Sequence, residues 1–227
     1  MPYEFLVLSL LTLVPGTLFW LARPDLRPLM KRAAAVSLPF AATEWLFYPA
    51  YWTPRFLFGL ADLIGFGIED VLFVVGLGAF TSTAYAVAFR RTLAPLGVPV
   101  RPGRRLVGVF AVAAMVTVAQ LSAGVPILYA AVVTMVSVSA ALLLERRDLA
   151  MPALLGALVS AAIYLGLCLV FGALLPGVFE RTWRASVLLP GTLLGVPLDE
   201  VLYGLGAGFG ATAMPAWAFG LRFVPRR

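Results

Sequence analysis

The phrase GFGIEDVLF, at residues 65–73, returns in altered form as GVPLDEVLY at residues 195–203. Each copy places two adjacent carboxylic acids inside a long apolar stretch, and the four acids are Glu69, Asp70, Asp199 and Glu200. One charged side chain at the centre of a membrane helix costs roughly 2.5–3.5 kcal/mol, so four ionised carboxylates would cost on the order of 10 kcal/mol. A penalty of that size predicts that these acids take part in the function of the protein.

The composition around these phrases is typical of an integral membrane protein. Of the 227 residues, 62% are hydrophobic and only 12% are charged. Apolar runs bounded by charged and turn residues predict an all-α fold of about seven transmembrane helices in a single membrane domain, residues 1–227. The predicted spans are 3–22, 33–50, 63–89, 106–122, 127–144, 149–175 and 188–221. The last span is too long for one simple crossing, and Pro190 and Pro197 predict that its first turns are broken or lie at the interface.

The positively charged residues lie mostly on one side of the predicted membrane. Fourteen of the 17 Lys and Arg residues fall in loops on one side of the predicted membrane, and only Arg55, Arg181 and Arg184 fall on the other. The positive-inside rule then predicts a multi-pass protein of the cell membrane with its N-terminus outside and its C-terminus in the cytoplasm. The net charge of +6 reflects this topology and contact with lipid headgroups, so no nucleic-acid partner is expected. The first span is expected to remain as an anchor, because Glu4 and no basic residue precedes its apolar run.

The two acidic phrases belong to a longer internal repeat. Residues 65–80 align with residues 195–210 without a gap at five identical positions, three of them glycines. Both copies run from the outer to the inner face, which predicts two parallel three-helix repeats, 1–105 and 123–227, joined by a linker helix at 106–122. Both acidic pairs then lie at a similar depth, where they can converge on one cavity.

Adjacent acids on a helix point about 100° apart, so one member of each pair faces the cavity and the other a neighbouring helix. The sequence leaves open which member faces which way. Glu69 shares a face with Phe73, and Asp199 shares one with Tyr203, each one turn along the helix. Glu44 adds a fifth acid near the outer end of the second span.

No Lys or Arg lies deep in the third or seventh span to neutralise these acids. Burial and a neighbouring carboxylate both favour a protonated acid, so at least one of these acids is expected to hold its proton near neutral pH. Pro197 can begin a half-helix whose N-terminal dipole favours an ionised Asp199. The first pair is therefore the better candidate for a general acid, and the second for a base.

These residues resemble the flavin-independent lycopene cyclases of bacteria, archaea and fungi, which occur as fused chains or as two small subunits. The pattern of that family is a Pro-x-Glu-(Glu/Asp) phrase followed by an apolar aromatic helix, once in each half, with a Trp upstream. Here the copies read GIED at 67–70 and PLDE at 197–200, so Gly replaces Pro in the first and Asp replaces Glu in the second. Glu44 with Trp45 resembles the acid on the preceding helix of the family's first half.

The resemblance implies a redox-neutral, proton-initiated cyclisation of lycopene or a related acyclic carotenoid to β-type rings, without a cofactor. An acid protonates the terminal alkene, the neighbouring double bond attacks the cation, and a base removes a ring proton. The catalytic candidates are Glu69, Asp70, Asp199, Glu200 and Glu44. Aromatic faces that could stabilise the cation and bind the substrate are those of Trp45, Trp52, Phe73, Trp183 and Tyr203. Taken singly, each aromatic more commonly serves in packing or in an interface belt.

Two other classes of function stay open. Membrane-integral cyclases of other terpenoids, such as meroterpenoids or C50 carotenoids, would use the same scaffold and the same chemistry. Transporters of the SWEET type also join parallel triple-helix repeats through an extra helix. Such a carrier lines its path with hydrogen-bonding side chains, yet this chain has no Asn and a single Gln, Gln120.

The residue inventory excludes several kinds of site. With no His and only Cys168, the chain lacks the parts for Ser-His-Asp chemistry and for His-ligated zinc or haem, so no metal site is expected. A retinal protein would need a Lys deep in its last helix, and the only Lys is Lys31 in a loop. The expected partners are a lipid-soluble polyene or terpenoid substrate and the lipid bilayer. Homo-oligomers, or association with other carotenoid-pathway enzymes, are compatible with the sequence.

Overall fold

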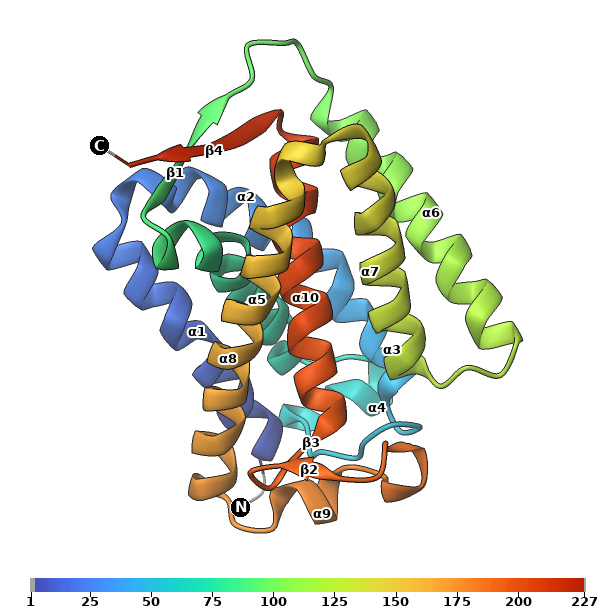
Figure 1. Cartoon of the computed structure of the whole chain (residues 1–227). Coiled ribbons are helices and arrows are strands. Elements are labelled where there is room, and N and C mark those ends of the chain that lie inside the picture. Colours follow the sequence, from blue (N-terminus) through green and yellow to red (C-terminus); the bar gives the residue numbers. More distant parts are fainter. Residues whose placement is uncertain (1–2, 227) are drawn as a thin grey trace.

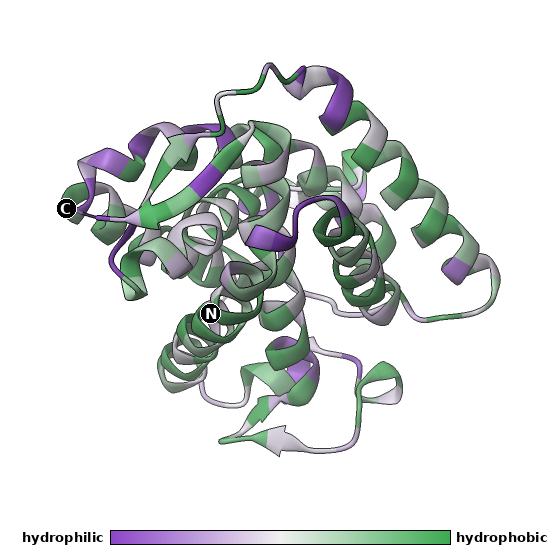
Figure 2. Ribbon diagram, turned by 45° about the horizontal axis from the view of Figure 1, so that its top comes forward, coloured by the Kyte–Doolittle hydropathy of each residue, from purple (hydrophilic) through white to green (hydrophobic). Residues whose placement is uncertain are grey.

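The computed structural model describes residues 3–226, and these residues are nearly all helical (Figure 1). The long helices are α1 (Glu4–Ala22), α5 (Ile68–Ala88), α6 (Pro102–Ser122), α7 (Ile127–Glu145), α8 (Ala150–Leu174) and α10 (Leu198–Ala218). Five of them, α1, α5, α6, α7 and α8, are long and apolar enough to cross a membrane. Figure 2 shows hydrophobic residues along the helices and hydrophilic residues mainly near their ends. The predicted all-α membrane class is confirmed, while the number of seven spans stays a prediction.

The predicted second span, 33–50, is not one continuous helix. Helix α2 (Arg27–Ser37) passes into the 3-10 helix η2 (Leu38–Thr43) and then into the short α3 (Glu44–Phe47). Pro39 lies in the first turn of η2, where its missing N–H cannot continue an α-helical ladder. This break turns Glu44 inward, where only 6% of the residue is exposed.

The predicted last span, 188–221, is helical only over α10, with a broken start as expected. A small antiparallel hairpin of β2 (Thr192–Leu193) and β3 (Val196–Pro197) precedes the helix, and Pro197 is its N-cap. The glycines and acids of α10 lower its mean hydropathy, which explains why it is not among the five apolar helices. In the first half, α4 (Leu60–Ile64) ends at Gly65, whose φ of 85° is shared by Gly195. Only glycine adopts this left-handed conformation readily, which explains why both copies keep it.

A second β-ribbon joins the ends of the two halves, and the sequence did not indicate it. Strand β1 (Arg91–Pro95) follows α5, strand β4 (Leu221–Pro225) follows α10, and the two pair in antiparallel register. At the opposite end of the bundle, Trp52 and Trp183 form an isolated antiparallel bridge. The remaining short elements are η1 (Pro24–Leu26), η3 (Leu57–Gly59), η4 (Arg147–Leu149), α9 (Val178–Thr182) and η5 (Ala185–Val187).

Helices α5 and α10 form the centre of the bundle and pack against each other. Helix α5 also packs against α1 and α2, and α10 against α7 and α8. In contrast, α6 lies along the outside (Figure 1), packs mainly on α7 and has no buried residue. The core is therefore built from both halves, while the linker helix covers one side of it.

Glycines of α5 and α10 make matching close contacts. At two equivalent positions of each helix, a Cβ would stand within 3.1 Å of an atom of an outer helix, closer than ordinary side-chain contacts, so glycine permits this close approach. The contacts are Gly76 with Thr12 of α1, Gly206 with Met135 of α7, Gly78 with Ser37 of α2, and Gly208 with Ser160 of α8. These paired contacts support our proposal that residues 1–105 and 123–227 are two repeats.

An arginine directly after α1 and another directly after α7 make matching contacts too. Arg23 donates two hydrogen bonds to the Asp25 carboxylate and one to the Arg91 carbonyl oxygen, at the start of β1. The Arg23 guanidinium holds the pKa of Asp25 at about 2, below its usual value. Equivalent bonds join Arg146 to Asp148 and to the carbonyl oxygen of Leu221, at the start of β4. Each arginine thus fastens an outer helix to the strand that follows a central helix.

The glycine contacts predict the effect of adding one methyl group. In Gly208→Ala, the new Cβ would meet Ser160 Cβ at 2.5 Å and Ala157 Cα at 2.9 Å. We expect a loss of about 1–3 kcal/mol in stability through overpacking. In the control Gly210→Ala the nearest atom is 3.4 Å away, and the better helix propensity of Ala should leave stability unchanged or raised by up to about 1 kcal/mol. Thermal unfolding in detergent measures both, and equal midpoints would contradict the packing of α10 on α8.

Candidate functional site

A cavity of about 490 Å³ lies between the two halves. Its walls come from α1, η2, α3 and α5 of the first half, from α7, α8 and α10 of the second, and from α6. Most of the lining is apolar, and the residues that line it include no Lys or Arg. The carboxylic acids among them are Glu44, Asp70 and Glu200. The volume falls in the range of small-molecule pockets.

Glu200, in the first turn of α10, is held by three hydrogen-bond donors. Its Oε1 accepts from Tyr51 Oη at 2.9 Å and from Trp183 Nε1 at 2.8 Å, while its Oε2 accepts from Tyr164 Oη at 2.8 Å. Tyr51 belongs to the first half and the other two donors to the second. An ionised carboxylate has about four acceptor sites on its two oxygens, so this arrangement fits an acceptor-only carboxylate with one site left.

Asp70 and Glu44 form the acidic group on the facing wall. Gly67 is the N-cap of α5, and its backbone N–H donates to Asp70 Oδ2 at 2.6 Å, which closes the first turn of that helix. Trp52 Nε1 donates to Glu44 Oε1 at 2.7 Å. Asp70 and Glu44 both line this part of the cavity. Two carboxyl groups in one apolar wall are expected to hold at least one proton between them.

The other acid of each phrase accepts a hydrogen bond from a loop and does not line the cavity. Glu69 Oε1 accepts the backbone N–H of Leu57 at 2.6 Å, and Asp199 Oδ2 accepts that of Leu189 at 3.0 Å. Asp199 Oδ1 also accepts from Tyr129 Oη at 2.6 Å. Both acids are fully buried and neither lines the cavity. Of the alternatives left open by the sequence, the structure therefore turns Asp70 and Glu200 toward the cavity.

Four of the five expected aromatic residues line the cavity, namely Trp52, Phe73, Trp183 and Tyr203. The rings of Phe73 and Tyr203 stack across the two halves with centroids 6.2 Å apart, and those of Trp52 and Trp183 lie 5.1 Å apart. Trp45 does not join them. It is 78% exposed and packs against Gly65, because α3 turns Glu44 inward and its neighbour outward.

Two residues of the site, Tyr51 and Tyr164, were missed by sequence reasoning. Tyr51 stands beside the singled-out Trp52, and Tyr164 is the one Tyr in the span 149–175. A hydroxyl in such an apolar span needs a partner, and this was the available signal. Among residues 3–226, no cluster of three His, Cys, Asp or Glu side chains could hold a metal ion. The arrangement can donate a proton from one wall and accept one at the other.

Residues 126–218 of the chain match the family model described as Lycopene cyclase. This part of the chain is therefore similar to the lycopene cyclase family. The matched residues include Glu200, Trp183 and Tyr164, whereas Glu44 and Asp70 lie outside them. The similarity supports a carotenoid cyclase activity. Comparison with curated proteins and with solved structures gives no match.

The donors around Glu200 predict the effect of removing one hydroxyl. In Tyr164→Phe, the buried Oε2 of Glu200 loses its hydrogen bond, so we expect stability to fall by about 1–3 kcal/mol. Tyr203→Phe on the same cavity is the matched control, because its hydroxyl makes no hydrogen bond within residues 3–226. Thermal unfolding in detergent compares the two. A Tyr203→Phe loss as large as that of Tyr164→Phe would contradict the assigned bond.

Proposed function

We propose that this protein is a membrane-integral, redox-neutral cyclase that closes the ψ-end group of lycopene, or of a related acyclic carotenoid, to a β-type ring. The observation that carries the proposal is the meeting of three carboxylic acids from both halves in one apolar, aromatic cavity. A polyene offers only its double bonds for recognition and reaction. An apolar cavity with one proton donor and one acceptor provides what such a substrate requires.

The pair of Glu44 and Asp70 is the proposed general acid. A proton shared between two carboxyls at the edge of an apolar cavity is available to a double bond and has little water to escape to. Asp70 is rigidly placed, because its Oδ2 caps the first turn of α5. Its other oxygen is then left for Glu44 and for the substrate.

Glu200 is the proposed base on the opposite half of the molecule. Three donors fix its two oxygens and leave about one acceptor site for a proton from the ring. Between protonation and proton loss, the substrate carries positive charge. The faces of Phe73, Tyr203 and Trp52 line the same space and can stabilise that charge by cation–π contact.

Glu69 and Asp199 are proposed as positioning residues. Each is buried directly before an acid of the cavity and accepts the backbone N–H of a loop that lies beside the site. Holding these loops keeps the first turns of α5 and α10 in place. This role differs from the direct catalytic role expected from the sequence. We also propose that the arginine-rich end of the bundle faces the cytoplasm of the cell, following the positive-inside rule.

The proposal is tested by expressing the chain in a bacterial host that accumulates lycopene and separating the extracted pigments by chromatography. We expect one-ring or two-ring carotenoids with the mass of lycopene, because the reaction is an isomerisation. Intact lycopene beside well-expressed membrane protein would contradict lycopene as the substrate. The same host supplied with C50 carotenoid or prenylated aromatic precursors then tests the other cyclases, and solute uptake into vesicles tests a transporter.

Single substitutions in the same host separate the roles of the acids. Asp70→Asn and Glu200→Gln should each lower ring formation by about 10²–10⁴-fold, the usual contribution of a general acid or base. Glu69→Gln and Asp199→Asn should lower the unfolding temperature and leave more turnover than either of these. Glu180→Gln, an exposed acid near the same end, is the control. Wild-type turnover in both Asp70→Asn and Glu200→Gln would remove the proposed roles.

A further inference from the structure

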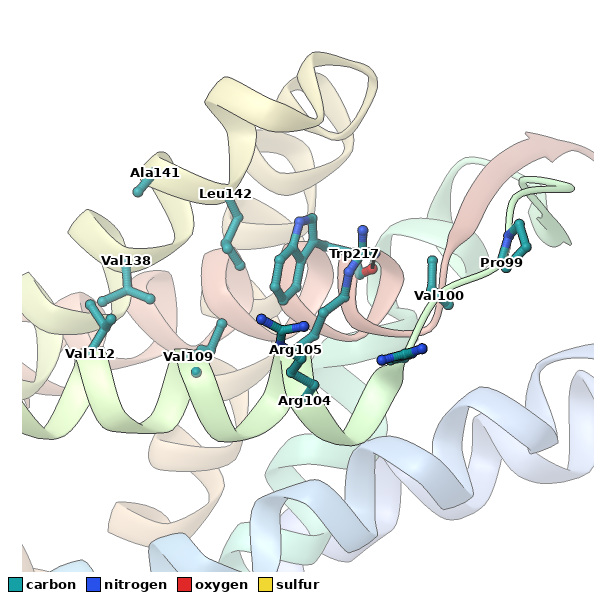
Figure 3. A pocket seen from close by; sticks show the side chains of 12 residues that line it. Pro99, Val100, Arg104, Arg105, Val109, Val112, Val138, Ala141, Leu142 and Trp217 are labelled. Atoms are coloured by element: carbon teal, nitrogen blue, oxygen red, sulfur yellow. Dashed lines mark hydrogen bonds between the residues drawn. The ribbon is translucent and has the colours of Figure 1, made fainter.

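A second cavity, of about 570 Å³, lies at the arginine-rich end of the bundle (Figure 3) and shares no lining residue with the central cavity. The start of α6 forms one wall, and the ends of α7 and α10 form the other, with Trp217 between them. The residues that line it include Arg101, Arg104 and Arg105 and no acid. The cavity therefore combines three positive charges with a largely apolar surface.

The three arginines differ in how they are held. Arg105 is fixed: its Nη1 donates to the Trp217 carbonyl oxygen at 2.6 Å, its guanidinium lies over the Trp217 ring, and Glu145 is 3.4 Å away. Arg101 and Arg104 are exposed and make neither an ion pair nor a side-chain hydrogen bond within residues 3–226. They stand at the N-terminus of α6, which has no side-chain cap. Free guanidinium groups and free helix N–H groups both favour a phosphate.

The other part of the cavity is an apolar slot that leads away from the arginines. Val109 and Val112 of α6 face Val138 of α7 across it (Figure 3). At Gly108, also in the lining, a Cβ would have no atom within 4 Å, so the slot is open there. A small inorganic anion would occupy only the arginine end. A ligand that fills both parts has an anionic head and a hydrocarbon chain.

We propose that this cavity binds an anionic phospholipid, with its phosphate on Arg101 and Arg104 and one acyl chain in the slot beside Gly108. The inference goes beyond the cyclase function and does not depend on it. Basic recesses between membrane helices are recognised sites for anionic headgroups. The apolar slot favours a bilayer lipid as the ligand, because a soluble phosphate has no acyl chain to fill it.

Such a lipid would act on α6, which has no buried residue of its own. The same helix lines both cavities, with Val112 in the lipid site and Phe110 and Ala113 in the central cavity. A lipid between α6 and the ends of α7 and α10 fills the space that separates them. It thereby holds the linker helix in its place beside the central cavity.

Binding is measured by native mass spectrometry of the full chain in neutral detergent, titrated with phosphatidylglycerol or phosphatidylcholine. We expect preferential binding of phosphatidylglycerol. An arginine near an anionic lipid raises the affinity about fivefold, so removing two in Arg101→Gln/Arg104→Gln should weaken binding about 25-fold. The charge-matched control Arg147→Gln/Arg226→Gln removes two exposed arginines outside the cavity and should bind as the wild type does. Equal weakening in both double variants, or equal binding of the two lipids, would overturn the site.

A second pair of variants tests the slot without changing charge. Gly108→Leu fills the open space beside the valines, whereas Gly103→Leu adds the same side chain earlier on α6, outside the cavity lining, where a Cβ also meets nothing. Only Gly108→Leu should lower phosphatidylglycerol binding, by about tenfold or more if the acyl chain is displaced from the slot. Wild-type binding in Gly108→Leu would refute the acyl site. Displacement of the lipid by millimolar inorganic phosphate would likewise refute it in favour of a soluble anion.

Discussion

A carboxyl group inside an apolar helix bundle must find hydrogen-bond donors, and much of the architecture around the cavity follows from that requirement. Within residues 3–226, none of the acids of the two phrases forms an ion pair with Lys or Arg. Their donors are backbone N–H groups and aromatic side chains. Glu200 alone draws on Tyr51, Tyr164 and Trp183, so three separate segments have to meet at the first turn of α10. The two halves thus share one polar centre.

Much of this centre could be predicted from sequence, because acidic residues inside apolar membrane spans are rare and usually functional. Which acid of each pair faces the cavity could not be predicted. That choice depends on the residue at which each helix begins, since one residue turns a side chain by about 100°. In α5 the N-cap is Gly67, which assigns the capping position to Asp70. The hydroxyls that hold Glu200 were equally hidden, because Tyr51 and Tyr164 lie 149 and 36 residues away in sequence.

In the fold too, some elements have a local signal in the sequence, whereas others depend on packing between segments far apart in the chain. Hydropathy locates the apolar helices well, and Pro190 and Pro197 indicate the broken start of α10. Pro39 is a comparable signal inside the second predicted span, 33–50, where hydropathy alone predicts one continuous helix. The ribbon of β1 and β4 has no local signal at all. Its five residue pairs form because α5 and α10 end side by side, and only the packing of the glycine-bearing helices determines that.

Helix α6 contributes Phe110, Ala113 and Thr117 to the wall of the central cavity, yet none of its own residues is buried by the rest of the chain. Hydrogen bonds of Gln120 with Thr134 and of Arg105 with the Trp217 carbonyl oxygen tie it to α7 and α10, while its outer face is open to the surroundings. In a bilayer, lateral pressure therefore acts on a helix that is also a wall of the cavity. In this sense the membrane that surrounds α6 is a neighbour of the proposed site, separated from it by one helix.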